Sequence, residues 1–179
     1  MPLPLSRGAS TSLQTGWITS TAASNQEVAS VDALVFLTPV IVGFTASAEF
    51  ASFAFVHPVI RRLEPGDHIR VEQGLLRTFG RVMPVLMPLS AVATVAYALA
   101  GDSGAGRTLG WISAGLVLLS VVTTLAVNVP INAATSRWDP EHPPDWQATR
   151  ERWEQFQGIR TVPLLMAFIL ICLATSLDS

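Results

Sequence analysis

The sequence predicts an all-α fold, a four-helix transmembrane bundle, from two observations. Of its 179 residues, 50% are hydrophobic and 13% are charged, whereas soluble domains carry about 25% charged residues. Four apolar stretches also approach or exceed the roughly 20 residues that cross the hydrocarbon core of a bilayer. Backbone groups in lipid must be hydrogen-bonded within their own segment, so we expect each stretch to be a helix.

The four predicted spans follow one another at residues 31–59, 82–100, 108–131 and 161–177. The prolines that they contain predict local kinks rather than strands. The first span holds a ladder of small residues, Gly43, Ser47 and Ala51, and the third holds another, Gly110 with Ala114. Small residues let helices approach closely in lipid, so we expect the first span to be a central helix. The fourth span is at the short end of the usual range.

Residues 1–30 differ in composition from the rest of the chain. They are rich in serine and threonine and lack the continuous apolar core of a signal peptide. We therefore expect a flexible tail over 1–30, followed by a membrane domain over 31–179.

The arginines predict an orientation, because an excess of positive charge marks the cytoplasmic side of a membrane. They concentrate in the segments that join spans one to two and spans three to four: Arg61, Arg62, Arg70, Arg77, Arg81, Arg137, Arg150, Arg152 and Arg160. Both termini are therefore predicted to lie outside. The chain is expected to be a multi-pass protein of the cell membrane.

An amphipathic cytoplasmic helix is predicted before the last span. Within residues 145–160, Trp146, Arg150, Trp153, Gln157 and Arg160 recur at helical spacing, and two prolines precede them. We expect this helix to lie at the interface or to run straight into the fourth span.

Composition and missing motifs exclude several functions. The net charge of −2 argues against nucleic-acid binding, and the single Cys172 excludes an internal disulfide. The sequence contains no Gly-rich phosphate loop, GxSxG or HExxH motif. His68 and His142 fall in predicted loops, where we expect them to be solvated, so haem ligation by paired intramembrane histidines is not indicated. The cofactor stays unknown.

Glu49 lies inside the first span, where an ionised side chain costs about 2.5–3.5 kcal/mol on insertion scales. A partner, a proton, a metal or a water-filled cavity should offset this cost. Glu49 is either a proton acceptor, metal ligand or substrate contact, or a protonated carboxyl group bonded to another helix.

Other polar residues fall near the cytoplasmic ends of the spans. His57 follows Glu49 by eight residues, about 12 Å of helix rise, so the two cannot hold one metal by themselves. It is either a functional group or an interfacial hydrogen-bonding residue. Asn128 and Asn132 bracket Pro130 and share one helix face. They either satisfy the backbone that the proline frees or bind a polar group of a substrate.

Trp153 and Arg160 belong to the same end of the predicted bundle. With His57 and the two asparagines they would line a polar funnel that has Glu49 at its floor. No metal site is predicted there.

Several motifs in this order resemble one family. The stretch 43–63, with AE, VHP and RRL, resembles the opening helix of the DUF1772 membrane proteins, which include the fungal anthrone oxygenases. FGRVMP at 79–84 resembles their second helix. NVPIN at 128–132, followed by Arg152-Trp153 and Arg160-Thr161-Val162, resembles their C-terminal pattern. The resemblance runs from about residue 31 to the C-terminus.

The resemblance implies a four-helix membrane bundle and, for some members, oxidation of an anthrone to an anthraquinone with O2. The family often has a histidine where this chain has Gln157. Glu49 or His57 would remove a proton from a flat phenolic, polyketide-type substrate, which would be bound by Asn128, Asn132, Trp153 and Arg160. The alternative is a non-catalytic accessory subunit or small-molecule-binding protein. Expected partners are the lipid bilayer, a hydrophobic aromatic small molecule, and a second copy or another membrane protein.

Overall fold

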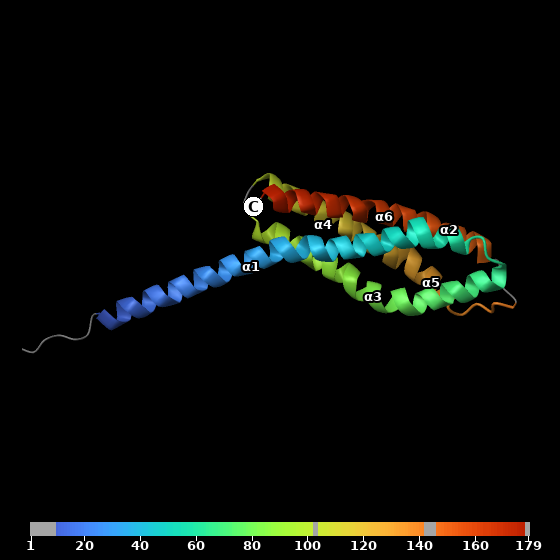
Figure 1. Ribbon diagram of the computed structural model, residues 1–179, viewed down its shortest axis with the longest axis horizontal. Coiled ribbons are helices and arrows are strands. Elements are labelled where there is room, and N and C mark those ends of the chain that lie inside the picture. The colour runs from blue at the N-terminus through green and yellow to red at the C-terminus, as the bar shows by residue number, and fades with distance from the viewer. Residues whose placement is uncertain (1–9, 102–103, 142–145, 178–179) are drawn as a thin grey trace, which may run out of the picture.

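The chain folds into four helical rods. The computed structural model describes residues 10–101, 104–141 and 146–177, with side-chain surroundings from residue 31 onward, and these ranges contain no strand. The predicted all-α fold is confirmed (Figure 1). In chain order the elements are α1 (Ser10–Ala51), the π-helix η1 (Ser52–Val56), α2 (His57–Ile60), α3 (Pro65–Ala100), α4 (Ala105–Thr123), the π-helix η2 (Thr124–Asn128), α5 (Val129–Thr135) and α6 (Trp146–Leu177).

Each rod is long and apolar enough to cross a membrane, over Val31–Ile60, Pro65–Ala100, Ala105–Thr135 and Trp146–Leu177. Apolar side chains also cover the outside of the bundle, where Phe36, Phe44 and Phe55 are each about two-thirds exposed. Such a surface fits lipid rather than water. At 36 residues, α3 is about 54 Å long, more than the roughly 30 Å hydrocarbon core, so its ends extend beyond that core.

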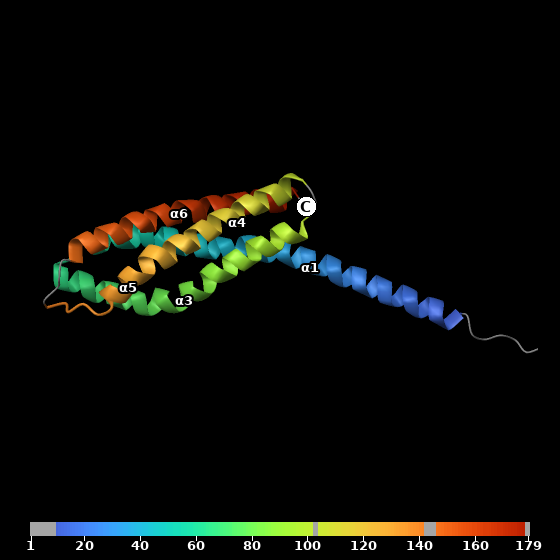
Figure 2. The same ribbon diagram turned by 180° about the vertical axis from the view of Figure 1, so that it is seen from behind.

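Three helices are longer than the predicted spans. Helix α1 begins at Ser10, within the segment expected to be a flexible tail, and projects beyond the bundle (Figures 1 and 2). Helix α3 takes in most of the predicted loop after the first span. The predicted amphipathic helix is the first half of α6 and runs straight into the last span. Residues 1–9 and 142–145, including His142, lie outside the described residues.

The buried face of α1 decides where Glu49 points. Val42, Thr45, Ala46 and Glu49 are all buried, so the carboxyl group faces the bundle interior. The predicted ladder of small residues is not buried along its length, because Ser47 is exposed between the buried Gly43 and the half-buried Ala51. Helix rotation thus places the apolar Val42 and Ala46 inward, together with Glu49.

Each π-helical turn ends two residues before a proline. Pro58 and Pro130 lack the backbone N–H that a regular helix would use. The residue before each proline donates its N–H to the carbonyl five residues back, that of Ser52 or Thr124. Single π-helical turns are frequent at functional sites. Here the first residue of each turn, Ser52 and Thr124, lines the same cavity.

Candidate functional site

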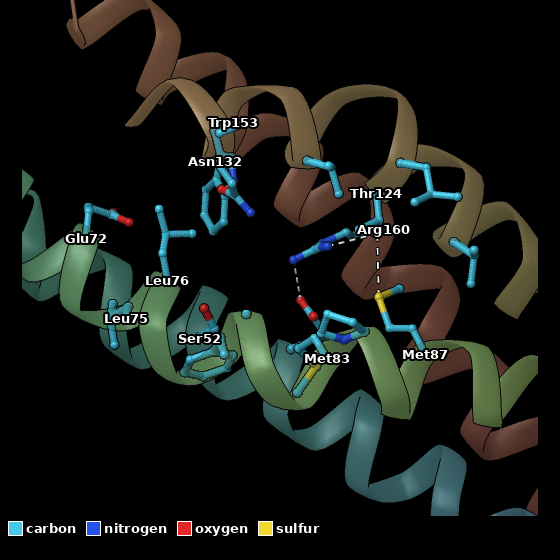
Figure 3. A pocket seen from close by; sticks show the side chains of 18 of the residues that line it. Ser52, Glu72, Leu75, Leu76, Met83, Met87, Thr124, Asn132, Trp153 and Arg160 are labelled. Atoms are coloured by element: carbon cyan, nitrogen blue, oxygen red, sulfur yellow. Dashed lines mark hydrogen bonds and ion pairs between the residues drawn. The ribbon is translucent and has the colours of Figure 1, made fainter. Parts of the chain in front are cut away.

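A cavity of about 540 Å³ lies between the helices, and apolar side chains form most of its wall. Figure 3 shows Leu76, Met83 and Met87 of α3 along one side, facing Trp153 and Arg160 of α6. A volume of this size is in the range of small-molecule sites, which combine an apolar wall with a few polar groups.

Glu49 is held from α6 at the deep end of the cavity. Its Oε2 accepts a hydrogen bond from Gln157 Nε2 at 2.6 Å and lies 2.7 Å from Arg160 Nη2. Glu49 and Gln157 are about 1% exposed. The sequence left open whether Glu49 would be a neutral acid or a paired one, and the structure gives it a cationic partner.

The Arg160 guanidinium is held in place by three side chains. Besides Glu49, Nε donates to Gln157 Oε1 at 3.0 Å and Nη1 donates to Thr124 Oγ1 at 2.8 Å. A guanidinium has a planar fork of five N–H donors, so these partners fix its plane. Arg160 still lines the cavity, and its charge therefore acts on whatever occupies that space.

The second carboxylate oxygen of Glu49, Oε1, has no hydrogen-bond donor beside it in the described part of the chain. Oε1 is buried and receives no hydrogen bond from the described residues. Glu49 is also part of the cavity wall. A buried acceptor without a donor costs free energy, about 1–3 kcal/mol for a neutral group and more for a charged one. This oxygen can therefore accept a proton or a hydrogen bond from a ligand.

A separate polar cluster lies at the other end of the cavity. Glu72 Oε1 is 2.6 Å from Arg150 Nη2, 3.3 Å from His57 Nδ1 and 3.7 Å from His68 Nε2. All four side chains are buried. The prediction that His68 is solvated was wrong, because α3 begins at Pro65 and turns it inward, where its Nδ1 meets the carbonyl of Ile60 at 3.1 Å.

Trp153 links this cluster to the cavity. Its ring lies 4.5 Å from the His57 ring and 4.4 Å below the Arg150 guanidinium, a cation–π arrangement. Its Nε1 donates a hydrogen bond to Asn132 Oδ1 at 2.7 Å. Three of the predicted site residues, the candidate base His57 and the candidate binding residues Asn132 and Trp153, are thus in one place and line the cavity together.

The predicted funnel divides into two polar ends, with Glu49 and Arg160 at one and His57, Asn132 and Trp153 at the other. Asn128 does not line the cavity. It is buried, and its Nδ2 lies 3.4 Å from the carbonyl of Trp153, at the back of the η2 turn.

Sequence reasoning missed Glu72, Arg150 and Thr124. Glu72 had a signal, because on a helix it shares a face with His68, four residues earlier, and with the apolar Ile69, three residues earlier. Arg150 was placed on the predicted amphipathic helix and counted among the orienting charges, but not in the site, and Thr124 looked like one hydroxyl among many. Among the residues that the structure describes, no group of three or more histidine, cysteine, aspartate or glutamate side chains could hold a metal ion.

The fold and the cavity define the class: a multi-pass helical membrane protein with an internal, mostly apolar cavity. The family model for anthrone oxygenase matches residues 75–170, more than half of the chain. The chain therefore belongs to the anthrone oxygenase family, as its motifs predicted. No curated protein and no solved structure matches it. The matched segment contains Asn132, Trp153 and Arg160, whereas Glu49 and His57 precede it.

Proposed function

We propose that this protein oxidises a flat phenolic substrate of the anthrone type with O2 inside the cavity. The observation that carries the proposal is the buried carboxylate of Glu49, a residue that lines a mostly apolar cavity and whose Oε1 receives no hydrogen bond from the described residues. Membership of the anthrone oxygenase family supports the choice of reaction.

The first step is removal of a proton from carbon. The CH2 group of an anthrone lies opposite the carbonyl, so loss of its proton gives an electron-rich carbanion whose charge spreads onto the carbonyl oxygen. Glu49 Oε1 takes this proton as a general base, a role typically worth about 10²–10⁴ in rate. The fixed guanidinium of Arg160, with its charge facing the cavity, stabilises the anionic oxygen.

The carbanion then reduces O2. A carbon–oxygen bond forms, and the proton held by Glu49 completes a hydroperoxide. Loss of water breaks the oxygen–oxygen bond and the second C–H bond and leaves a carbonyl. One anthrone and one O2 thus give one anthraquinone and one water, and Glu49 ends in the protonation state in which it began.

The opposite end of the cavity binds the rest of the substrate. Trp153 offers an aromatic surface, and Asn132 offers a polar group for a phenolic oxygen. The Glu72 carboxylate orients the His57 ring through Nδ1, so His57 is the second proton acceptor to test. Asn128 instead satisfies the α6 backbone behind the cavity. The arginine distribution supports a cytoplasmic position for this end in the cell membrane.

The test is oxygen uptake and quinone formation in membranes supplied with an anthrone. We expect the Glu49→Gln variant to lose at least about 100-fold in rate above empty membranes, since glutamine cannot take the proton. Asp67→Asn, which changes an exposed carboxylate, serves as the matched control.

Three results separate the alternatives. Equal rates for the wild type and Glu49→Gln would remove Glu49 from the mechanism. A loss in His57→Asn but not in Glu49→Gln would move the base to His57. A wild type that binds the anthrone without consuming O2 would favour the non-catalytic binding protein.

A further inference from the structure

The cavity wall is buried on one side and exposed on the other. Lining residues from the α1–η1–α2 rod and from α6, such as Glu49, Trp153 and Arg160, are buried. Among the lining residues from η2 and α5, Leu125 and Val129 are turned outward, 62% and 46% exposed, whereas Thr124 and Asn132 are half-buried. The wall is thus complete only on the α1 and α6 side.

The facing part of α3 is also exposed. Gly80, Pro84 and Pro88 line the cavity and reach the bundle surface, as does Ala133 of α5 on the other side. We call these four residues, with Leu125 and Val129, the side opening. Helix α3 packs extensively along α4 but meets α5 at few points, which leaves the space between them unfilled.

The end of the cavity nearest the loops is crossed by a buried polar cluster, and Ser136 is the exposed lining residue there. The ion pair of Glu72 and Arg150 crosses it, with His57 and Trp153 stacked beside it, and all four side chains are buried. Gln73 Nε2 ties α3 to the end of the α5 rod through the carbonyl of Thr135 at 3.1 Å. A ligand that entered through this cluster would have to break a buried ion pair.

The side opening lies along the apolar parts of the two helices. Pro84 and Pro88 fall within the apolar span predicted at 82–100, and Leu125 and Val129 fall within that predicted at 108–131. Gly80 adjoins this apolar part, beside the exposed Arg81 at its end. The opening therefore extends from the level of the lipid headgroups into the acyl chains.

We propose that the cavity is filled from the lipid, through the side opening between α3 and the η2–α5 segment, by an uncharged planar aromatic molecule dissolved in the bilayer. A charged molecule is poorly soluble in the acyl region and does not take this route. For the identity of the ligand the inference rests on the proposed function: a neutral anthrone enters, its charge arises only beside Arg160, and the neutral quinone leaves the same way.

Thiol labelling tests the route without substrate or oxygen. In a Cys172→Ala background, Ser52→Cys places one thiol on the buried wall of the cavity. The protein is held in lipid nanodiscs, so both aqueous faces are accessible. N-phenylmaleimide is the neutral probe and a sulfonated maleimide the charged one, each normalised to its rate at an exposed Asp67→Cys thiol. We expect the neutral probe to label the Ser52→Cys thiol at least tenfold faster.

Two glycines supply a matched pair of obstructions. A Cβ added at Gly80, on the side opening, or at Gly115, on the outer surface of α4, meets nothing within 4 Å. Gly80→Phe should slow labelling by the neutral probe several-fold, whereas Gly115→Phe should leave it unchanged. Leu125→Ala widens the side opening and should speed labelling by the neutral probe. This opposite effect keeps the route testable if Gly80→Phe folds poorly.

Several results would overturn the route. These are equal normalised rates for the two probes, no labelling by the neutral probe, or the same rate in Gly80→Phe as in Gly115→Phe. Failure of anthrone oxidation would leave this labelling pattern unchanged, so the two proposals fail separately.

Discussion

Glu49 of α1 and Arg160 of α6 form a buried ion pair, with 2.7 Å between Oε2 and Nη2, that joins the first and last spans of the bundle. In a bilayer neither charged side chain is solvated by bulk water, so each charge offsets the free-energy cost of burying the other. Gln157, one helical turn before Arg160, bridges the pair by donating to Glu49 and accepting from the guanidinium. In this chain the amide of Gln157 thus fills a bridging role between the two charges.

Removing one member of this pair should destabilise the bundle more than removing both. Glu49→Leu or Arg160→Met leaves an unpaired buried charge and should cost about 3–5 kcal/mol, whereas the double variant should recover most of this loss. Unfolding of the detergent-solubilised protein measures the difference. All three variants should lack anthrone oxidation. Additive losses in the double variant would show that the pair is not coupled.

Glu72 should contribute far more to the stability of the bundle than an exposed carboxylate on the same helix. Glu72→Gln leaves the buried Arg150 uncompensated and should cost about 3 kcal/mol. Asp67→Asn removes one of the two exposed carboxylate partners of Arg70, the other being Glu141, and should cost less than about 1 kcal/mol. Thermal unfolding of the two variants side by side checks the prediction, which equal melting temperatures would contradict.

The hydrogen bond from Trp153 to Asn132 can be removed without losing the aromatic ring. Trp153→Phe deletes the Nε1–H donor and should cost about 1 kcal/mol while keeping the contact with His57. Asn132→Leu removes the acceptor. A double-mutant cycle should give a coupling above 0.5 kcal/mol, the usual threshold for residues in contact. A cycle that closes additively would mean that the bond contributes nothing to stability.

Gly43 should be intolerant of even a methyl group. An added Cβ would lie 2.7 Å from Cε2 of Phe168, so the ring of α6 has to move. We expect Gly43→Ala to cost about 1 kcal/mol or more through overpacking. Gly115→Ala meets no atom within 4 Å and should stabilise its helix by about 0.5–1 kcal/mol. Melting temperatures that shift in the same direction would contradict this reading.

Hydropathy alone determined the four membrane-crossing rods and the place of Glu49 within the first, because lipid demands long apolar helices whatever their neighbours. The ordered motifs likewise determined the family. The sequence also picked out Arg160 and Trp153, because a charge or an aromatic at helical spacing inside or beside a span is a local signal.

The tertiary structure decided which of these residues meet. Glu49 and Gln157 are 108 positions apart, and their contact depends on the rotation and axial level of two helices. The same geometry buried His68 and Glu72, which composition had placed in a loop, and turned Asn128 away from the cavity. Local hydropathy is enough to predict the membrane-spanning helices. The shape of a cavity depends on the distances between helices, which no local sequence pattern determines.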